Sequence, residues 1–162
     1  MMEHEKATNF ETLRHIMLVR NLLDNIIVEL LKRAEGHDQS KLEEPELSTF
    51  AEYTSKLAQC TFGSDEYTQF IAEMKPALDH HYAANRHHPE HFRDEVDAAS
   101  GQSPVDRMNL VDLIEMLCDW KASTMRHRDG DIMKSIAVSR ERFLLSDQVV
   151  NILKNTVSIL EE

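Results

Sequence analysis

Apolar residues recur at helical spacing through almost the whole of this sequence. Between residues 8 and 34 they follow one another in steps of three and four, as in Phe10, Leu13 and Met17, which is the period of an amphipathic α-helix. The pattern predicts a long first helix over about residues 8–34, with Gly36 as its C-terminal cap.

The rest of the chain continues this pattern between short polar turns. Pro45 and Ser64 mark helix starts, because a proline costs no hydrogen bond in a first turn and a serine side chain caps one. Pro76 is expected to bend or restart the third helix. Ser103 as cap, followed by Pro104 at the first helical position, predicts the start of the next helix. Helices are therefore expected over residues 45–60, 64–88, 103–125, 131–144 and 147–160.

The composition also favours an all-α fold of about six to seven helices. The 162 residues include four glycines, four prolines and eight methionines, with few runs of β-branched residues that would favour a sheet. A chain of this length fits one compact domain, residues 1–162, with its own hydrophobic core.

The charge balance excludes one class of partner. The formal net charge is −11 and the isoelectric point is about 5.2, whereas proteins that bind the nucleic-acid backbone present clustered lysine and arginine. A small phosphorylated substrate stays compatible with this charge.

Cysteine usage and the N-terminus indicate a compartment. Cys60 and Cys118 lie far apart and outside any CxxC spacing, so neither a disulfide framework nor a zinc ribbon is indicated. The first residues lack a basic segment followed by an apolar one, and no apolar run approaches membrane-spanning length. We expect a soluble protein of the reducing cytoplasm with no membrane partner; the oligomeric state is open, a homodimer included.

The stretch HDQSK carries the densest chemistry of the first half of the chain. His37 and Asp38 are adjacent directly after the first helix, and Lys41 follows three residues later. On that helix His15 shares an apolar stripe with Val19. It is therefore either a buried histidine with one ordinary hydrogen-bond partner or a metal ligand.

Histidines cluster in the stretch DHHYAANRHHPEHF, which holds five of the nine in the chain. If the stretch stays helical, His81 and His88 share one face, and His80 and His87 share a neighbouring one. Clustered imidazoles repel one another when protonated, but neutral imidazole is the commonest metal ligand. Metal binding is thus favoured over a solvated polar turn, and which of the four coordinate stays open.

Three acidic residues share one face of the helix expected after Ser103. Asp112, Glu115 and Asp119 lie at i, i+3 and i+7 on a helix that is apolar on most other sides. Buried carboxylates need cations or hydrogen-bond donors, so metal or histidine partners explain them better than solvent does. The expected core stripe of the same helix is Leu110, Leu113, Ile114 and Leu117.

Together these residues resemble the pattern of the HD-domain metal-dependent phosphohydrolases, from His15 to about Ala122. His15 matches the first histidine of that pattern, and His37 with Asp38 matches its signature pair. Lys41 stands where many members read HDxGK, although serine replaces the glycine here.

The second half of the chain extends the resemblance. His80 and His81 are similar to the paired histidines of the HD-GYP phosphodiesterases, but the DGxGYP continuation is absent. LCDWKA resembles the context of the last aspartate, so Asp119 is preferred and Asp112 is a second candidate. HDQSK, HHYAANRHHPE and DLIEMLCDWKAS together resemble a small bacterial and phage family of uncharacterised HD-like proteins.

The resemblance implies a single HD-like helical bundle that hydrolyses a small nucleotide-like phosphomonoester or phosphodiester through a metal-activated water. The implied cofactor is one or two divalent transition-metal ions, Mn, Fe, Co, Ni or Zn. Lys41 and Arg86 would neutralise phosphate charge, and Glu115 would act as general acid or orient a ligand imidazole. The implied metal ligands are His15, His37, Asp38, His80, His81, His88, Asp112 and Asp119.

Two other functions fit the same residues. Some HD-fold oxygenases hold a di-iron centre with a similar ligand set, and tightly bound iron with oxygen uptake would distinguish that chemistry. The other alternative is a non-catalytic, metal-stabilised binding protein, phage-encoded for instance, in which chelation would unfold the chain without loss of any activity.

Overall fold

The computed structural model of the protein describes residues 3–57, 59–60, 64–97, 101–126 and 130–160. The chain divides into two compact units, Met1–Gly36 and His37–Glu162, which are described separately. Within the described ranges every regular element is helical and no strand occurs, so the predicted all-α fold is confirmed.

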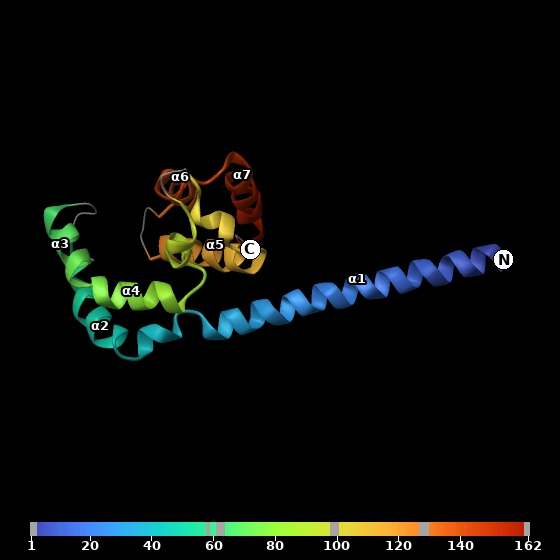
Figure 1. Ribbon diagram of the computed structural model, residues 1–162, viewed down its shortest axis with the longest axis horizontal. Coiled ribbons are helices and arrows are strands. Elements are labelled where there is room, and N and C mark those ends of the chain that lie inside the picture. The colour runs from blue at the N-terminus through green and yellow to red at the C-terminus, as the bar shows by residue number, and fades with distance from the viewer. Residues whose placement is uncertain (1–2, 58, 61–63, 98–100, 127–129, 161–162) are drawn as a thin grey trace. The chain divides into compact units, whose positions relative to one another are not determined.

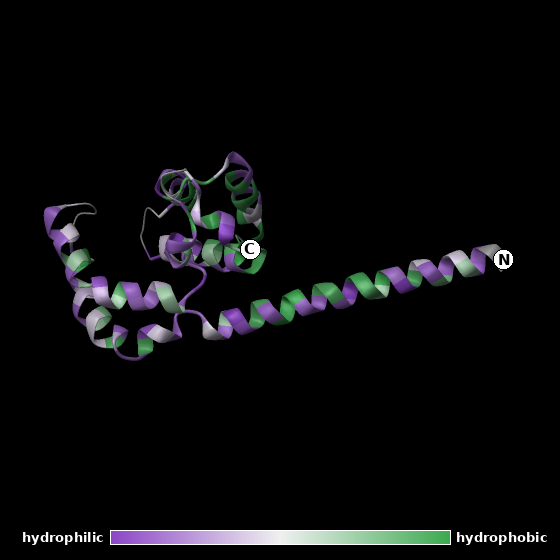
Figure 2. Cartoon of the chain, viewed as in Figure 1, coloured by the Kyte–Doolittle hydropathy of each residue, from purple (hydrophilic) through white to green (hydrophobic). Residues whose placement is uncertain are grey.

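The first unit is a single helix, α1 (Glu3–Gly36), longer at both ends than the expected residues 8–34. Figure 2 shows apolar turns alternating with polar ones along it. A lone helix has no interior in which to bury apolar side chains. Gly36 is the last residue of α1 rather than a left-handed cap, so that prediction is wrong; the left-handed backbone falls at Asp38, with φ 55°.

The second unit holds the other helices of the described residues, labelled where there is room in Figure 1. Its α-helices are α2 (Glu46–Leu57), α3 (Asp65–Glu73), α4 (Lys75–Ala84), α5 (Leu110–Thr124), α6 (Ile132–Phe143) and α7 (Asp147–Thr156). Short 3-10 helices lie between and after them: η1 (Gln39–Leu42), η2 (Pro89–Glu95), η4 (Pro104–Arg107) and η5 (Val157–Leu160).

Polar caps determine several of the helix boundaries. Ser64 caps α3 as predicted, because its hydroxyl accepts a hydrogen bond from the Tyr67 amide. Pro76 lies in the first turn of α4, which confirms the predicted restart there. Ser103 instead caps the short η4, and α5 begins later, at an Asn109 cap.

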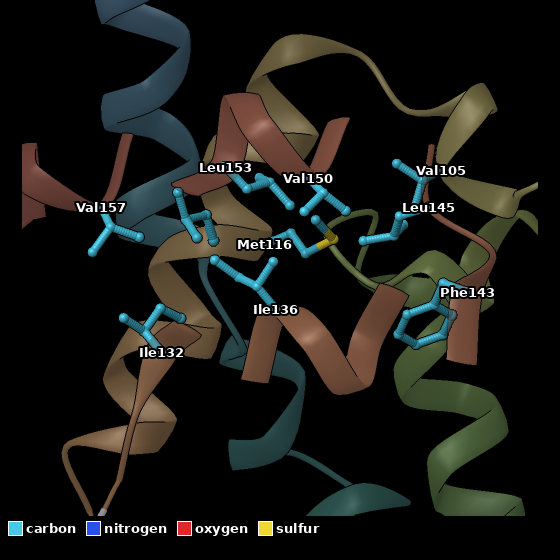
Figure 3. Packing of buried hydrophobic residues seen from close by; sticks show 10 residues of the cluster. Val105, Met116, Ile132, Ile136, Phe143, Leu145, Val150, Leu153 and Val157 are labelled. Atoms are coloured by element: carbon cyan, nitrogen blue, oxygen red, sulfur yellow. The ribbon is translucent and has the colours of Figure 1, made fainter. Parts of the chain in front are cut away.

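The hydrophobic core of the second unit lies among α5, α6 and α7, where side chains from the three helices point toward one another (Figure 3). Met116 and Ile136 have no exposed surface at its centre. The core residues are Val105, Met116, Leu117, Ile132, Ile136, Phe143, Leu145, Val150, Leu153 and Val157.

The expected core stripe of α5 is only partly correct. Leu117 is buried and Leu113 packs against the core, but Leu110 is 69% exposed and Ile114 is also exposed. The buried Asp112 and Met116 point inward instead. The helix is therefore turned so that an acidic residue lies inside.

No helix within the described ranges combines the length and the apolar character that a membrane span requires.

The core predicts a sharp difference between two positions on α6. Ile136→Ala should lower the free energy of unfolding by about 2–4 kcal/mol, because it leaves a cavity among fully buried side chains. Val138→Ala, at a position 62% exposed on the same helix, should change it by less than about 0.5 kcal/mol. Urea unfolding followed by circular dichroism measures both. Equal losses in the two variants would contradict the described packing of α6.

Candidate metal centre

Imidazole and carboxylate side chains from four segments of the second unit meet around Asp38. His37 and Asp38 come from the turn before η1, and His81 comes from α4. The segment between α4 and η2 supplies His87 and His88, and α5 supplies Glu115 and Asp119.

The backbone at Asp38 makes this meeting possible. Asp38 is left-handed, a conformation that aspartate and asparagine adopt more readily than other residues with a Cβ. Its carbonyl then accepts the Lys41 amide at 2.9 Å, which begins η1. The turn thereby folds Lys41 back, and its Nζ lies 2.6 Å from Asp38 Oδ2.

The two oxygens of Asp38 contact different histidines. Oδ1 lies 3.4 Å from His81 Nε2 and 3.5 Å from His87 Nε2. Oδ2 lies 3.7 Å from His37 Nε2. Asp38 is thus the common neighbour of three imidazoles.

His88 reaches the same place without a continuous helix. Helix α4 ends at Ala84, so the helical face expected to carry His81 and His88 does not form. The chain turns instead, and the two Nε2 atoms come to 2.8 Å from each other. The predicted pairing of these histidines is therefore present, but a turn produces it.

The donor atoms form groups that share Asp38. One group is Asp38, His81, His87 and His88, and another is His37, Asp38 and Asp119; in each, the donor atoms lie within 4.8 Å of one another. A third combination joins His37 and His87 to Glu115 through the other nitrogen of each ring, Nδ1.

The third combination is better explained as support for the ligands than as a metal site. Glu115 Oε1 lies 3.0 Å from Nδ1 of both His37 and His87. An ionised carboxylate only accepts hydrogen bonds, so the Nδ1 atoms must donate. In the neutral form, a ring oriented in this way has its lone pair on Nε2, the atom that faces Asp38.

Glu46 does the same for His81. Glu46 is completely buried at the start of α2, and its Oε2 lies 2.8 Å from His81 Nδ1. The Ser40 hydroxyl donates to the same oxygen at 3.0 Å. Burial alone would raise the pKa of Glu46, but hydrogen bonds from His80, Ser40 and His81 outweigh it and hold that pKa below its usual value.

The protonation states suit metal binding. Burial, and the neighbouring His87 and His81, lower the pKa of His88 to about 2, and burial with the Lys41 charge lowers that of His81. Burial would raise the pKa of Asp38, but the hydrogen bond and charge of Lys41 outweigh it and lower that pKa. Near neutral pH these histidines are neutral and the aspartate is ionised, as coordination requires.

Two buried atoms at the centre bear on whether the residues fit a metal ion. Asp38 Oδ1 and His87 Nε2 have no hydrogen-bond partner within the part of the chain that is described. Buried polar atoms are costly when unpaired, and the 2.8 Å contact between the Nε2 atoms of His81 and His88 requires a proton or a cation between them. Imidazole and carboxylate together suit borderline divalent ions. The second unit therefore has buried groups that could hold a metal ion.

Other predicted residues lie elsewhere. His80 is exposed, and its Nδ1 lies 2.7 Å from Glu46 Oε1, so it belongs to no donor group of the described residues. His15 lies on α1, in the other unit, so its role as a ligand stays a prediction.

Asp112 and Arg86 come together, but with each other. The Arg86 guanidinium donates to both oxygens of Asp112, with Nη2 at 3.1 Å from Oδ2. Asp112 also accepts the Asn109 amide in a capping box at the start of α5. These contacts favour a structural role for Asp112 and leave Asp119 as the acidic candidate on α5.

Two residues of the centre could not be predicted from the sequence. The sequence does not decide which of the four clustered histidines coordinate, and the structure puts His87 in the central group. Glu46 was not considered at all, because nothing about one glutamate on an amphipathic helix indicates a histidine partner 35 positions later.

A cavity of about 690 Å³ adjoins the centre. His88 and Asp119 form part of its wall, and the remaining lining comes mainly from α4, η2, α5 and α6. The donor groups are therefore reached from a space large enough for a small organic molecule.

Comparison with known proteins yields one match. The family described as "Family of unknown function (DUF5662)" matches residues 4–159. No curated protein and no solved structure matches the chain.

The two adjacent histidines of α4 should behave differently toward metal. His81→Ala should weaken binding of Co(II) or Zn(II) at least about tenfold, because it removes a donor of the central group. His80→Ala should weaken binding less than His81→Ala does, because His80 touches Glu46 and belongs to no donor group of the described residues. Calorimetric titration measures both affinities, and the visible spectrum of Co(II) reports the ligands. A larger loss in His80→Ala than in His81→Ala would contradict the grouping.

Glu46 should control the tautomer of His81. Glu46→Gln leaves a side chain of the same shape that binds Nδ1–H less strongly, so metal affinity should fall about 10–100-fold. The ¹⁵N chemical shifts of the ring, measured in the metal-free protein, should show a smaller fraction with the proton on Nδ1. Glu52→Gln, on the exposed side of α2, is the matched control. Unchanged His81 shifts in Glu46→Gln would exclude this role.

Proposed function

The chain belongs to DUF5662, a family of unknown function, and from its own residues we propose that it is a metal-dependent phosphohydrolase. The substrate class is a small, nucleotide-like phosphate ester, either a monoester or a diester. The cofactor is one or two divalent transition-metal ions from the set Mn, Fe, Co, Ni and Zn.

One observation carries the proposal. Asp38 is shared by two donor groups, one with His81, His87 and His88 and the other with His37 and Asp119. A carboxylate with a donor group on either side is suited to hold two cations. The same residues include the His-Asp pair on which the resemblance to HD-domain phosphohydrolases rests.

The ions supply a defined chemistry when bound: they lower the pKa of a bound water and polarise a phosphoryl oxygen. Mixed nitrogen and oxygen donors favour borderline transition ions over Mg²⁺ or Ca²⁺, which prefer oxygen alone.

Lys41 has two functions in this proposal. Its ammonium keeps Asp38 ionised through the 2.6 Å contact with Oδ2. Its side chain is 34% exposed, so further N–H donors stay accessible to a phosphate oxygen. Lys41 can therefore offset the charge that develops on the ester as its bond breaks.

Glu115 and Arg86 take supporting roles. The contacts of Glu115 with two Nδ1 atoms favour orientation of the ligand imidazoles over proton donation to a leaving group. Arg86 is paired with Asp112, which favours stabilisation of α5 over binding of phosphate.

Phosphate release should depend on added metal and on Asp38. With Mn, Co, Ni, Fe or Zn, the protein should release phosphate from at least one member of a panel of nucleotides and generic phosphate esters. Asp38→Asn should lower the rate at least about 100-fold, because it removes the shared carboxylate charge. Asparagine also tolerates the left-handed backbone, so the fold should be retained.

Malachite green assays detect the phosphate released from monoesters, release of p-nitrophenol from bis(p-nitrophenyl) phosphate detects hydrolysis of a diester, and metal analysis is made on the purified protein. Glu52→Gln, on the exposed side of α2, is the control that keeps activity. Purified protein without stoichiometric metal, and with no release under any of the five ions, would overturn the proposal. Oxygen uptake by an iron-loaded sample would favour the alternative function, a di-iron oxygenase.

A further inference from the structure

We propose that the 690 Å³ cavity beside the metal centre binds the organic part of the substrate, a planar ring that packs on Trp120 and bears hydrogen-bond acceptors directed to Arg142. This inference rests on the proposed function, since it takes the phosphate to lie at the metal ligands.

The cavity and the donor groups share two residues. His88 belongs to the central group and Asp119 to the second one, and both line the cavity. A molecule whose phosphate contacts the donor groups can therefore extend only a short way before it occupies this space. The volume lies in the range typical of small-molecule sites and far exceeds that of a phosphate ion.

Trp120 offers a rigid aromatic surface in the cavity wall. Its ring stacks on Phe143 with centroids 6.4 Å apart and an interplanar angle of 12°, and Phe143 is part of the hydrophobic core. A ring held in this way needs little ordering when a ligand binds. Aromatic surfaces of this kind bind planar rings by stacking.

Polar groups lie at another part of the wall. Arg142 Nη2 donates to Glu90 Oε1 at 2.6 Å, and the guanidinium lies over the Phe143 ring, with its carbon 4.8 Å from the centroid. Glu90 is almost fully buried, and its Oε2 has no hydrogen-bond partner among the described residues. The Oε2 atom is itself closed to solvent, whereas the Arg142 side chain is 56% exposed, so its guanidinium is the group that a carbonyl oxygen or ring nitrogen of a ligand can reach.

Helix α6 completes the polar lining. Lys134, Val138 and Arg142 lie one turn apart on the exposed side of α6 that lines the cavity, and Ser135 and Ser139 lie beside them. Two cations and two hydroxyls therefore face the cavity, together with the aromatic ring. A phosphate ester with a flat, hydrogen-bonding ring matches this lining better than a phosphate with a short aliphatic group.

Trp120 is the single tryptophan of the chain, so intrinsic fluorescence reports binding in the cavity directly. The zinc-loaded protein is titrated with a nucleoside monophosphate, a hexose phosphate and inorganic phosphate. The nucleoside monophosphate should cause a saturable change in fluorescence, with an affinity at least about tenfold higher than that of the other two. Equal affinities for the nucleoside and hexose phosphates would overturn the assignment of a planar ring.

Two variants of α6 test the location. Val138→Phe places a larger side chain in the cavity wall and should weaken binding at least about tenfold. Ala137→Phe, at an exposed position of the same helix outside the cavity lining, should leave the affinity within about twofold. Equal affinities in the two variants, or no saturable change with any ligand, would overturn the proposal.

Hydrolysis of p-nitrophenyl phosphate separates this inference from the proposed function. Saturable binding that Val138→Phe weakens, without hydrolysis of any ester, would keep the cavity assignment and reject the phosphohydrolase. Metal-dependent hydrolysis with no preference for a ring and no effect of Val138→Phe would keep the enzyme and reject the cavity as its substrate site.

Discussion

The candidate metal centre of the second unit is arranged around the charge of one carboxylate, Asp38. A partly buried aspartate is unfavourable unless cations and donors surround it, and Lys41 supplies only one of these. The imidazoles of His37, His81 and His87 approach the same group with their Nε2 atoms, which carry lone pairs in the neutral rings. Negative charge and electron pairs thus accumulate at one point, and a divalent cation is the partner that suits them.

Buried glutamates impose this arrangement from outside. Glu46 and Glu115 accept hydrogen bonds from the Nδ1 atoms of the rings, which face away from Asp38. Each imidazole is thereby held in one orientation. Such an arrangement costs stability unless every member is satisfied.

The sequence predicted the helices and much of this centre, since periodicity, caps and the His-Asp pair are local features. It placed Glu115 and Asp119 on one face of α5, but it could not predict how far that helix is turned about its axis. Asp112 therefore became the partner of Arg86, although it lies on the same acidic stripe. Glu46 and His87 depend on contacts between distant segments, which no local pattern encodes.

The spread of the donors along the chain has a consequence for folding. His37 and Asp119 belong to one donor group and lie 3.8 Å apart, although the long stretch of sequence from η1 to α5 separates them, and α4 and the turn after it join them from between. A cation shared by such segments would act as a reversible cross-link. In the chain-entropy description, covalent closure of a loop of that length contributes about 4 kcal/mol. The order in which the segments assemble would then depend on the supply of the ion in the cell.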